Sequence, residues 1–229
     1  MENYYGTTSS AAVKDTIYRV FAWMSGALAI TGLTAYYIAA TPAIMHSLIS
    51  SPGIFIGIFL AQLAVVMVLS MMIMRLSFVA AFGLFIAYAI LTGVTLSTIF
   101  LVYTSSSIVV TFMVAAGMFA SMAVYGAVTK SDLTSLGSLM GMMLWGLILA
   151  LVGNLFIKSS VLDLVTAFFG VIIFAGLTAY DMQRIKGIVS YGYSQGADKI
   201  ALIAALQLYL DFINLFLSLL RIMGNKKQD

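Results

Sequence analysis

Long uncharged apolar segments separated by short polar stretches dominate the chain from Val20 onward. A helix needs about 20 mostly apolar residues to cross a bilayer, and these segments reach that length. They do not alternate between apolar and polar positions, as the strands of an outer-membrane barrel would. The pattern therefore predicts an all-α integral membrane protein with seven transmembrane helices. The expected spans are 20–40, 53–73, two within 76–129 that meet near 104–107, 136–157, 162 to about 184, and 200–223.

The polar stretches define the expected domain organisation. Residues 1–19 form a polar N-terminal tail, residues 20–223 a single seven-helix membrane domain, and residues 224–229 a short basic C-terminal tail. A polar loop at 187–199, which contains glycine, separates the sixth span from the seventh.

Composition excludes several function classes. Of the 229 residues, 62% are hydrophobic and 8% charged, whereas soluble domains carry about 25% charged residues. An ordinary soluble enzyme and a disordered scaffold are therefore excluded. The chain has no cysteine, which removes disulfides, thiolate metal sites and thiol catalysis. The basic residues are too few and too dispersed for a nucleic-acid partner, so the expected partner is the lipid bilayer.

The basic residues predict the orientation of the chain. With seven spans, the side of the N-terminus collects seven basic residues and the other side four, which favours a cytoplasmic N-terminus. A re-entrant last segment would make the count ten against one, so the side of the C-terminus stays open. The first group is Lys14, Arg19, Arg75, Lys130, Arg184, Lys186 and Lys199, and the second is Lys158, Arg221, Lys226 and Lys227.

Two acids lie well inside the apolar spans, Asp181 and Asp211. An aspartate at the centre of a membrane helix costs roughly 2.5–3.5 kcal/mol on insertion scales, so such a residue is a functional-site candidate. Gln207, Asp211, Asn214 and Ser218 share one face of the last helix, because they are spaced four, three and four residues apart. This polar stripe indicates a polar path, although hydrogen bonds between helices would also explain Gln207 and Asn214.

Sequence alone does not show that the two acids meet, but their chemistry follows if they do. Two carboxylates in a low dielectric do not easily ionise together, so the pair shares a proton and responds to pH and to cations. Calcium prefers six to eight oxygen ligands, and two carboxylates provide at most four, so the expected calcium site is weak and transient. Elsewhere, Lys158 and Asp163 flank the turn before the sixth span, where a salt bridge between them is expected.

The segments FAGLTAYDMQ at 174–183 and LYLDFINLF at 208–216 resemble the signature segments of the Bax inhibitor-1 family, in its bacterial branch. The resemblance covers nearly the whole chain from Thr16. It implies a central last helix wrapped by two layers of three helices. It also implies a pH-sensitive calcium leak, gated at Asp181 and Asp211, with Arg75 at the end of the second span as a latch. A bacterial inner (plasma) membrane location follows, with calcium as the transported ion and no cofactor.

Two alternatives to the calcium leak stay open. A non-transporting regulator that binds other membrane proteins fits the same composition, and a proton/calcium exchanger shares every residue-level feature with a leak. An intramembrane aspartyl protease would need a Gly-x-Gly-Asp motif, but the residues before Asp211 are Leu208, Tyr209 and Leu210. We therefore expect no enzymatic activity.

Overall fold

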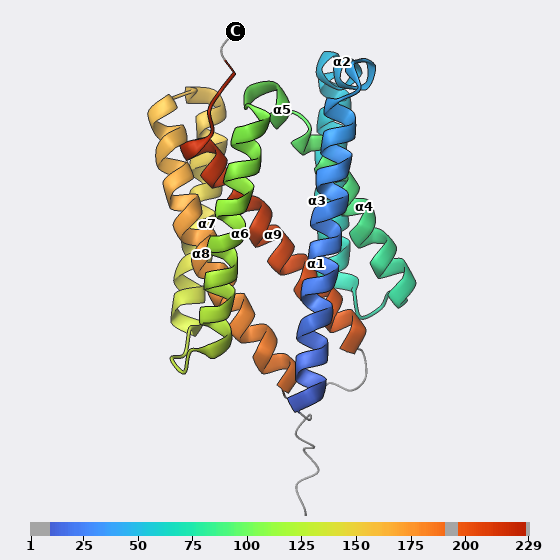
Figure 1. The fold of residues 1–229 in the computed structure, drawn as a ribbon, viewed down its shortest axis with the longest axis vertical. Coiled ribbons are helices and arrows are strands. Elements are labelled where there is room, and N and C mark those ends of the chain that lie inside the picture. Colours follow the sequence, from blue (N-terminus) through green and yellow to red (C-terminus); the bar gives the residue numbers. More distant parts are fainter. Residues whose placement is uncertain (1–9, 191–196, 228–229) are drawn as a thin grey trace, which may run out of the picture. The chain divides into compact units, whose positions relative to one another are not determined.

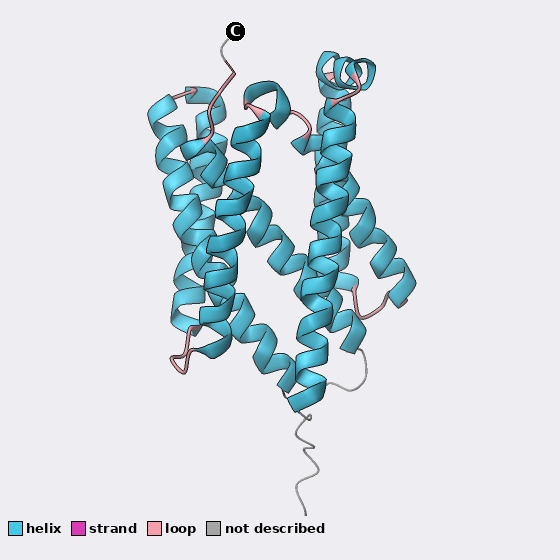
Figure 2. Ribbon diagram, viewed as in Figure 1, coloured by secondary structure: helices cyan, strands magenta, loops and turns pink. Residues whose placement is uncertain are grey.

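The computed structural model describes residues 10–190 and 197–227, and within these ranges every regular element is a helix (Figures 1 and 2). Seven of the described helices, counting α4 and α5 together, are long and apolar enough to span a membrane, which confirms the predicted class. The short α2 lies between two of them. In chain order the helices are α1 (Ser10–Ala39), α2 (Pro42–Ser50), α3 (Pro52–Met72), α4 (Phe78–Leu96), α5 (Ile99–Val102), α6 (Ser105–Val128), α7 (Thr134–Ile157), α8 (Ser160–Ser190) and α9 (Ala197–Met223).

Several helices are longer than the apolar runs that predict them. α1 begins at Ser10 rather than at Val20, and α8 continues to Ser190. Hydropathy marks only the part of a helix that lies in hydrocarbon, whereas backbone hydrogen bonds continue into the polar interface. α9 begins at Ala197 with Asp198 in its first turn, where an acid interacts favourably with the helix dipole. Both ends of the predicted 187–199 loop are thus helical, and its centre, residues 191–196, lies outside the described residues.

The predicted break within the uncharged 76–129 stretch is confirmed. α5 ends at Val102 and α6 begins at Ser105, with Thr104 as the N-cap of α6. The Thr104 hydroxyl accepts a hydrogen bond from the backbone N–H of Ser107, and Ser77 caps α4 in the same way through Ala80. Such caps satisfy backbone donors that the first turn of a helix leaves unpaired.

The chain divides into two compact units. Among the described residues, the first unit comprises residues 10–103, 189–190, 197–209 and 227, and the second comprises residues 104–188 and 210–226. Each unit thus holds three spans and about half of α9, which changes unit after Tyr209. The arrangement of two three-helix layers around α9, and the single membrane domain, stay predictions.

In the first unit, α4 packs against both α1 and α3. The Thr31 hydroxyl donates to the Ala89 carbonyl at 2.9 Å and lies 2.7 Å from the Tyr209 hydroxyl, so α1, α4 and α9 meet at one point. Phe85 contacts the Tyr209 ring edge-on. α3 fully buries only Leu69 and exposes most of its other apolar side chains, as expected of a lipid-facing helix.

In the second unit, α9 packs against α6 through aromatic rings. Phe112 and Phe119 contact Phe212 edge-on at centroid distances of 5.2 and 5.5 Å. The backbone of Asn225 bonds to Thr104 and to the Ser107 hydroxyl, so the residues after α9 lie beside the start of α6. The α6–α7 loop is at the far end of α6. Residues 224–226, which belong to this unit, therefore lie at its opposite end from that loop.

Candidate functional site

The structure brings together the two acids that the sequence singles out. Asp181 on α8 and Asp211 on α9 both belong to the second unit, and their side chains lie within hydrogen-bonding range of each other. Asp181 is half-buried, whereas Asp211 is only 6% exposed. Among the described residues, the Oδ2 atom of Asp211 has no hydrogen-bond partner. An orphaned carboxyl oxygen at this depth is costly, which indicates a ligand or a proton at the pair.

Arg184 is the cation that acts on this pair from α8. It lies three residues after Asp181, and its guanidinium acts electrostatically on the Asp181 carboxyl group. Its side chain is exposed, and among the described residues it forms no ion pair with Asp181 at contact distance. Arg184 therefore offsets part of the negative charge of Asp181 from a distance and does not form a direct ion pair with it.

The polar stripe of α9 is satisfied largely within its own helix. Asn214 Nδ2 donates to the Leu210 carbonyl, and the Ser218 hydroxyl donates to the Asn214 carbonyl, both at 2.8 Å. These two donors therefore do not fasten α9 to another helix. Gln207 lies in the first unit, half-buried, while Asp211, Asn214 and Ser218 lie in the second.

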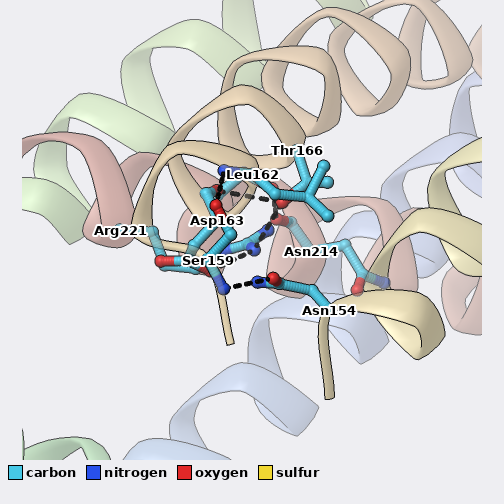
Figure 3. A network of polar contacts seen from close by, with 8 residues as sticks. Asn154, Ser159, Leu162, Asp163, Thr166, Asn214 and Arg221 are labelled. Carbon is cyan, nitrogen blue, oxygen red and sulfur yellow. Dashed lines mark hydrogen bonds and ion pairs between the residues drawn. The ribbon is translucent and has the colours of Figure 1, made fainter. Parts of the chain in front are cut away.

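A polar network surrounds the end of α9 (Figure 3). Arg221 Nη1 donates to Asp163 Oδ1 at 3.2 Å and to the Thr166 hydroxyl at 3.3 Å. The expected Lys158–Asp163 salt bridge is wrong, since Asp163 instead pairs with Arg221 from α9. Lys158 ends α7 in the left-handed conformation, with a φ of 54°.

Sequence inspection missed a set of buried hydroxyl groups in the second unit. Thr111 is 1% exposed, and among the described residues its hydroxyl has no hydrogen-bond partner. The available signal was spacing, because Ser107 and Thr111 lie four residues apart on one face of α6. Ser107, Thr166 and Thr178 are also buried in this unit, together with Ser218, which belongs to the predicted polar stripe. The interior of the second unit is therefore more polar than the apolar sequences of its individual helices indicate.

Arg75, the expected latch, lies in the turn that follows α3 and is exposed. It belongs to the first unit, whereas both acids belong to the second. Its role as a latch therefore stays a prediction.

The geometry bears on metal binding through the number of ligands. Among the described residues, no three His, Asp or Glu side chains gather as a metal site. The acid pair therefore offers at most four carboxylate oxygens to a cation, fewer than the six to eight that calcium prefers. A cation here would need water or carbonyl oxygens as well.

Seven apolar helices and a buried, interacting pair of carboxyl groups define a polytopic α-helical membrane protein with an ionisable intramembrane site. The family model described as "Inhibitor of apoptosis-promoting Bax1" matches residues 13–228. The chain belongs to this Bax inhibitor family.

Bacterial relatives match over nearly their whole length. The inner membrane protein YbhL of Escherichia coli is 44% identical over 220 residues, which cover 95% of this chain and 94% of YbhL. A protein of Borreliella burgdorferi is 42% identical and covers 92% of both chains. A protein of Deinococcus radiodurans is 41% identical over 94% of this chain and 92% of its own length. The similarity therefore extends over nearly the whole chain.

Proposed function

We propose that this protein passes calcium or a similar cation down its gradient, and that protonation of Asp181 and Asp211 sets the gate. The observation that carries the proposal is the buried acid pair with one Asp211 oxygen unpartnered among the described residues. Two carboxyl groups in a low dielectric share a proton more readily than both ionise. Loss of that proton leaves a negative charge that a cation can offset.

The ligand count supports transit rather than storage of the cation. The pair holds too few oxygens for a tight calcium site, so a bound ion would leave readily. The Ser218 hydroxyl and the Asn214 side chain continue the polar stripe from Asp211 toward the end of α9. Thr111, whose hydroxyl has no partner within the part of the chain that the structure describes, supplies a further buried oxygen in the same unit.

Arg75 is proposed as the latch of this gate. A guanidinium near a carboxylate favours the ionised form of the acid. The positive charge of Arg75 would therefore compete with the proton that the pair shares. Arg75→Gln, which removes the charge, should change the pH dependence of flux, whereas Arg75→Lys should largely preserve it. An identical pH profile in the Gln variant would remove Arg75 from the gate.

We further propose an inner-membrane location with the N-terminus in the cytoplasm. The inner-membrane relative YbhL supports the location, and the seven-to-four distribution of basic residues supports the orientation. The chain has no cysteine, so single cysteines can be placed at Lys130 and Lys158, which flank the two ends of α7. An impermeant thiol reagent added outside the cell should label the cysteine at 158 and spare the one at 130. The reverse labelling would invert the topology.

Calcium flux into proteoliposomes, measured from about pH 6 to about pH 8, tests the gate around the neutral range in which a proton-sharing pair responds. Asp181→Asn and Asp211→Asn should each abolish most of the pH dependence. Two matched controls remove an acid from the same helices, Asp163→Asn on α8 and Asp198→Asn on α9. Both control variants should retain the pH dependence of calcium flux. An unchanged pH profile in both Asp181→Asn and Asp211→Asn would refute gating by protonation of this pair.

The same preparation separates the two alternatives. A proton/calcium exchanger would accumulate calcium against its gradient when a pH gradient is imposed, whereas a leak would not. A non-transporting regulator would show no flux at any pH and would tolerate Asp211→Asn.

A further inference from the structure

The α8 turn that carries Asp181 is clamped by the α6–α7 loop. Gln183 makes both halves of the clamp: its Oε1 accepts a hydrogen bond from the Leu133 backbone N–H at 2.9 Å, and its Nε2 donates to the Ser131 carbonyl at 2.8 Å. One side chain thus pairs a backbone donor and a backbone acceptor that lie two residues apart. This contact joins segments about 50 residues apart in the chain, as the sequence separations of 50 and 52 show.

Three further contacts hold the neighbouring turns of α8 from the same side. Gly126 on α6 lies against the Ala179 backbone carbonyl so closely that a Cβ would overlap it. A Cβ at Gly137 on α7 would lie 2.5 Å from the Tyr180 ring. Lys186 donates from its ammonium to the Ala127 carbonyl at 2.7 Å, near the end of α6. The ends of α6 and α7 therefore grip α8 before and after Asp181.

Helix geometry connects this grip to the acid. Successive residues are about 100° apart around an α-helix, so Gln183 projects from roughly the opposite side of α8 to Asp181. The Gln183 side is held by the loop, while the Asp181 side meets Asp211. Fixing one side of a rigid helical turn fixes the direction of the other.

We propose that Gln183 is a positioning residue, whose clamp on Ser131 and Leu133 sets the rotation and height of α8 at which Asp181 meets Asp211. The inference rests on the proposed function, because it makes Gln183 the residue that controls the distance between the two gating carboxyl groups. Without the clamp, the α8 turn can rotate and the carboxyl groups separate.

Few other charges in the second unit could replace this effect. α6 and α7 carry no charged residue, so from these helices nothing charged faces Asp181. Arg184 and Asp211 act on Asp181 directly. The clamped loop holds Lys130 and Asp132, both exposed, and the Asp132 carboxylate accepts hydrogen bonds from Thr134. The clamp therefore acts on the pair through geometry.

The test follows the protonation of the acid pair directly. The carboxylic C=O stretch in infrared spectra is titrated in the full-length protein in lipid nanodiscs, for the native chain and for Gln183→Ala. Coupled acids lose their protons in two separated steps. Gln183→Ala should bring the two steps together, and the pH dependence of calcium flux should flatten.

Two more variants make the comparison specific. Gln62→Ala is the matched control, since Gln62 also loses a side-chain hydrogen bond, from its Nε2 to Thr95 in the first unit. It should keep both titration steps separate. An ionised Gln183→Glu retains the acceptor for Leu133 but has no donor for Ser131, so its titration should be intermediate between native and Ala. It also decides the question if Gln183→Ala does not fold.

The outcomes distinguish this inference from the function on which it rests. Separated steps in the native chain and unchanged steps in Gln183→Ala, or in Gln183→Glu if the Ala variant does not fold, would overturn the positioning role. A native chain with separated steps but no calcium flux would overturn the proposed function and leave the role of Gln183 supported by the titration. If the two acids of the native chain titrate in one step, they are not coupled, and the positioning role of Gln183 is refuted as well.

Discussion

Gly126 on α6 lies directly against the backbone carbonyl of Ala179 on α8, two residues before Asp181. The two helices approach so closely at this point that no side chain fits between them. In lipid, where apolar surface alone does not drive helices together, such small-residue contacts set how closely helices pack.

Gly126→Ala should therefore displace α8 from α6. Overpacking a close contact typically costs about 1–3 kcal/mol of stability, because backbone must move to accommodate the methyl group. The matched control is Gly117→Ala on the same helix, where a Cβ would meet nothing within 4 Å. Thermal unfolding in detergent should show a lower midpoint for Gly126→Ala and an unchanged or higher midpoint for Gly117→Ala. Equal midpoints in both variants would contradict the close contact.

A chain of two hydrogen bonds should couple Tyr209 and Thr31 energetically. The Thr31 hydroxyl donates to the Ala89 carbonyl, so Tyr209 is left as the donor to Thr31. Tyr209→Phe should cost about 1 kcal/mol, the usual net value of one hydrogen bond. Thr31→Val should cost about 1–3 kcal/mol, because the buried Tyr209 hydroxyl loses its acceptor.

A double-mutant cycle checks this coupling. The double variant should be less destabilised than the sum of the two single variants, since it leaves no orphaned hydroxyl. Measurements of unfolding free energy in mixed micelles supply the four corners of the cycle. Strictly additive values would mean that the two hydroxyl groups are independent.

The acids could be predicted from sequence and most of their surroundings could not. Asp181 and Asp211 stand out because a charge in an apolar span is costly and rare. Proximity along the chain predicts Lys158 as the partner of Asp163, but the structure pairs Asp163 with Arg221, 58 residues away. Gln183 carries no such signal, since a glutamine near a helix end has many possible partners. Long-range pairing of ordinary polar residues is decided by packing, which a single sequence does not encode locally.

The Arg221–Asp163 ion pair should contribute little to stability. The side chains are 23% and 47% exposed, so solvent screens their attraction. Pairs of this kind are typically worth about 0.2–1 kcal/mol. The interaction energy from Arg221→Gln, Asp163→Asn and the double variant should fall within this range and decrease in high salt. A larger, salt-independent value would indicate a pair shielded from water.

The loop that Gln183 clamps should weaken in acid through Asp132. The Thr134 hydroxyl and then its backbone N–H, at 2.6 and 2.9 Å, lower the pKa of the Asp132 carboxyl group. An acid with a lowered folded pKa contributes stability above its unfolded pKa of about 3.9 and loses it as the pH falls through the folded value. Asp132→Asn should therefore unfold at a lower temperature than the native chain near neutral pH, and this gap should close below about pH 4. Thr134→Val keeps only the backbone hydrogen bond to Asp132. Its unfolding temperature should therefore lie closer to that of the native chain than the unfolding temperature of Asp132→Asn does. A gap that stays constant down to strongly acidic pH would mean that the Asp132 carboxylate does not stabilise the start of α7.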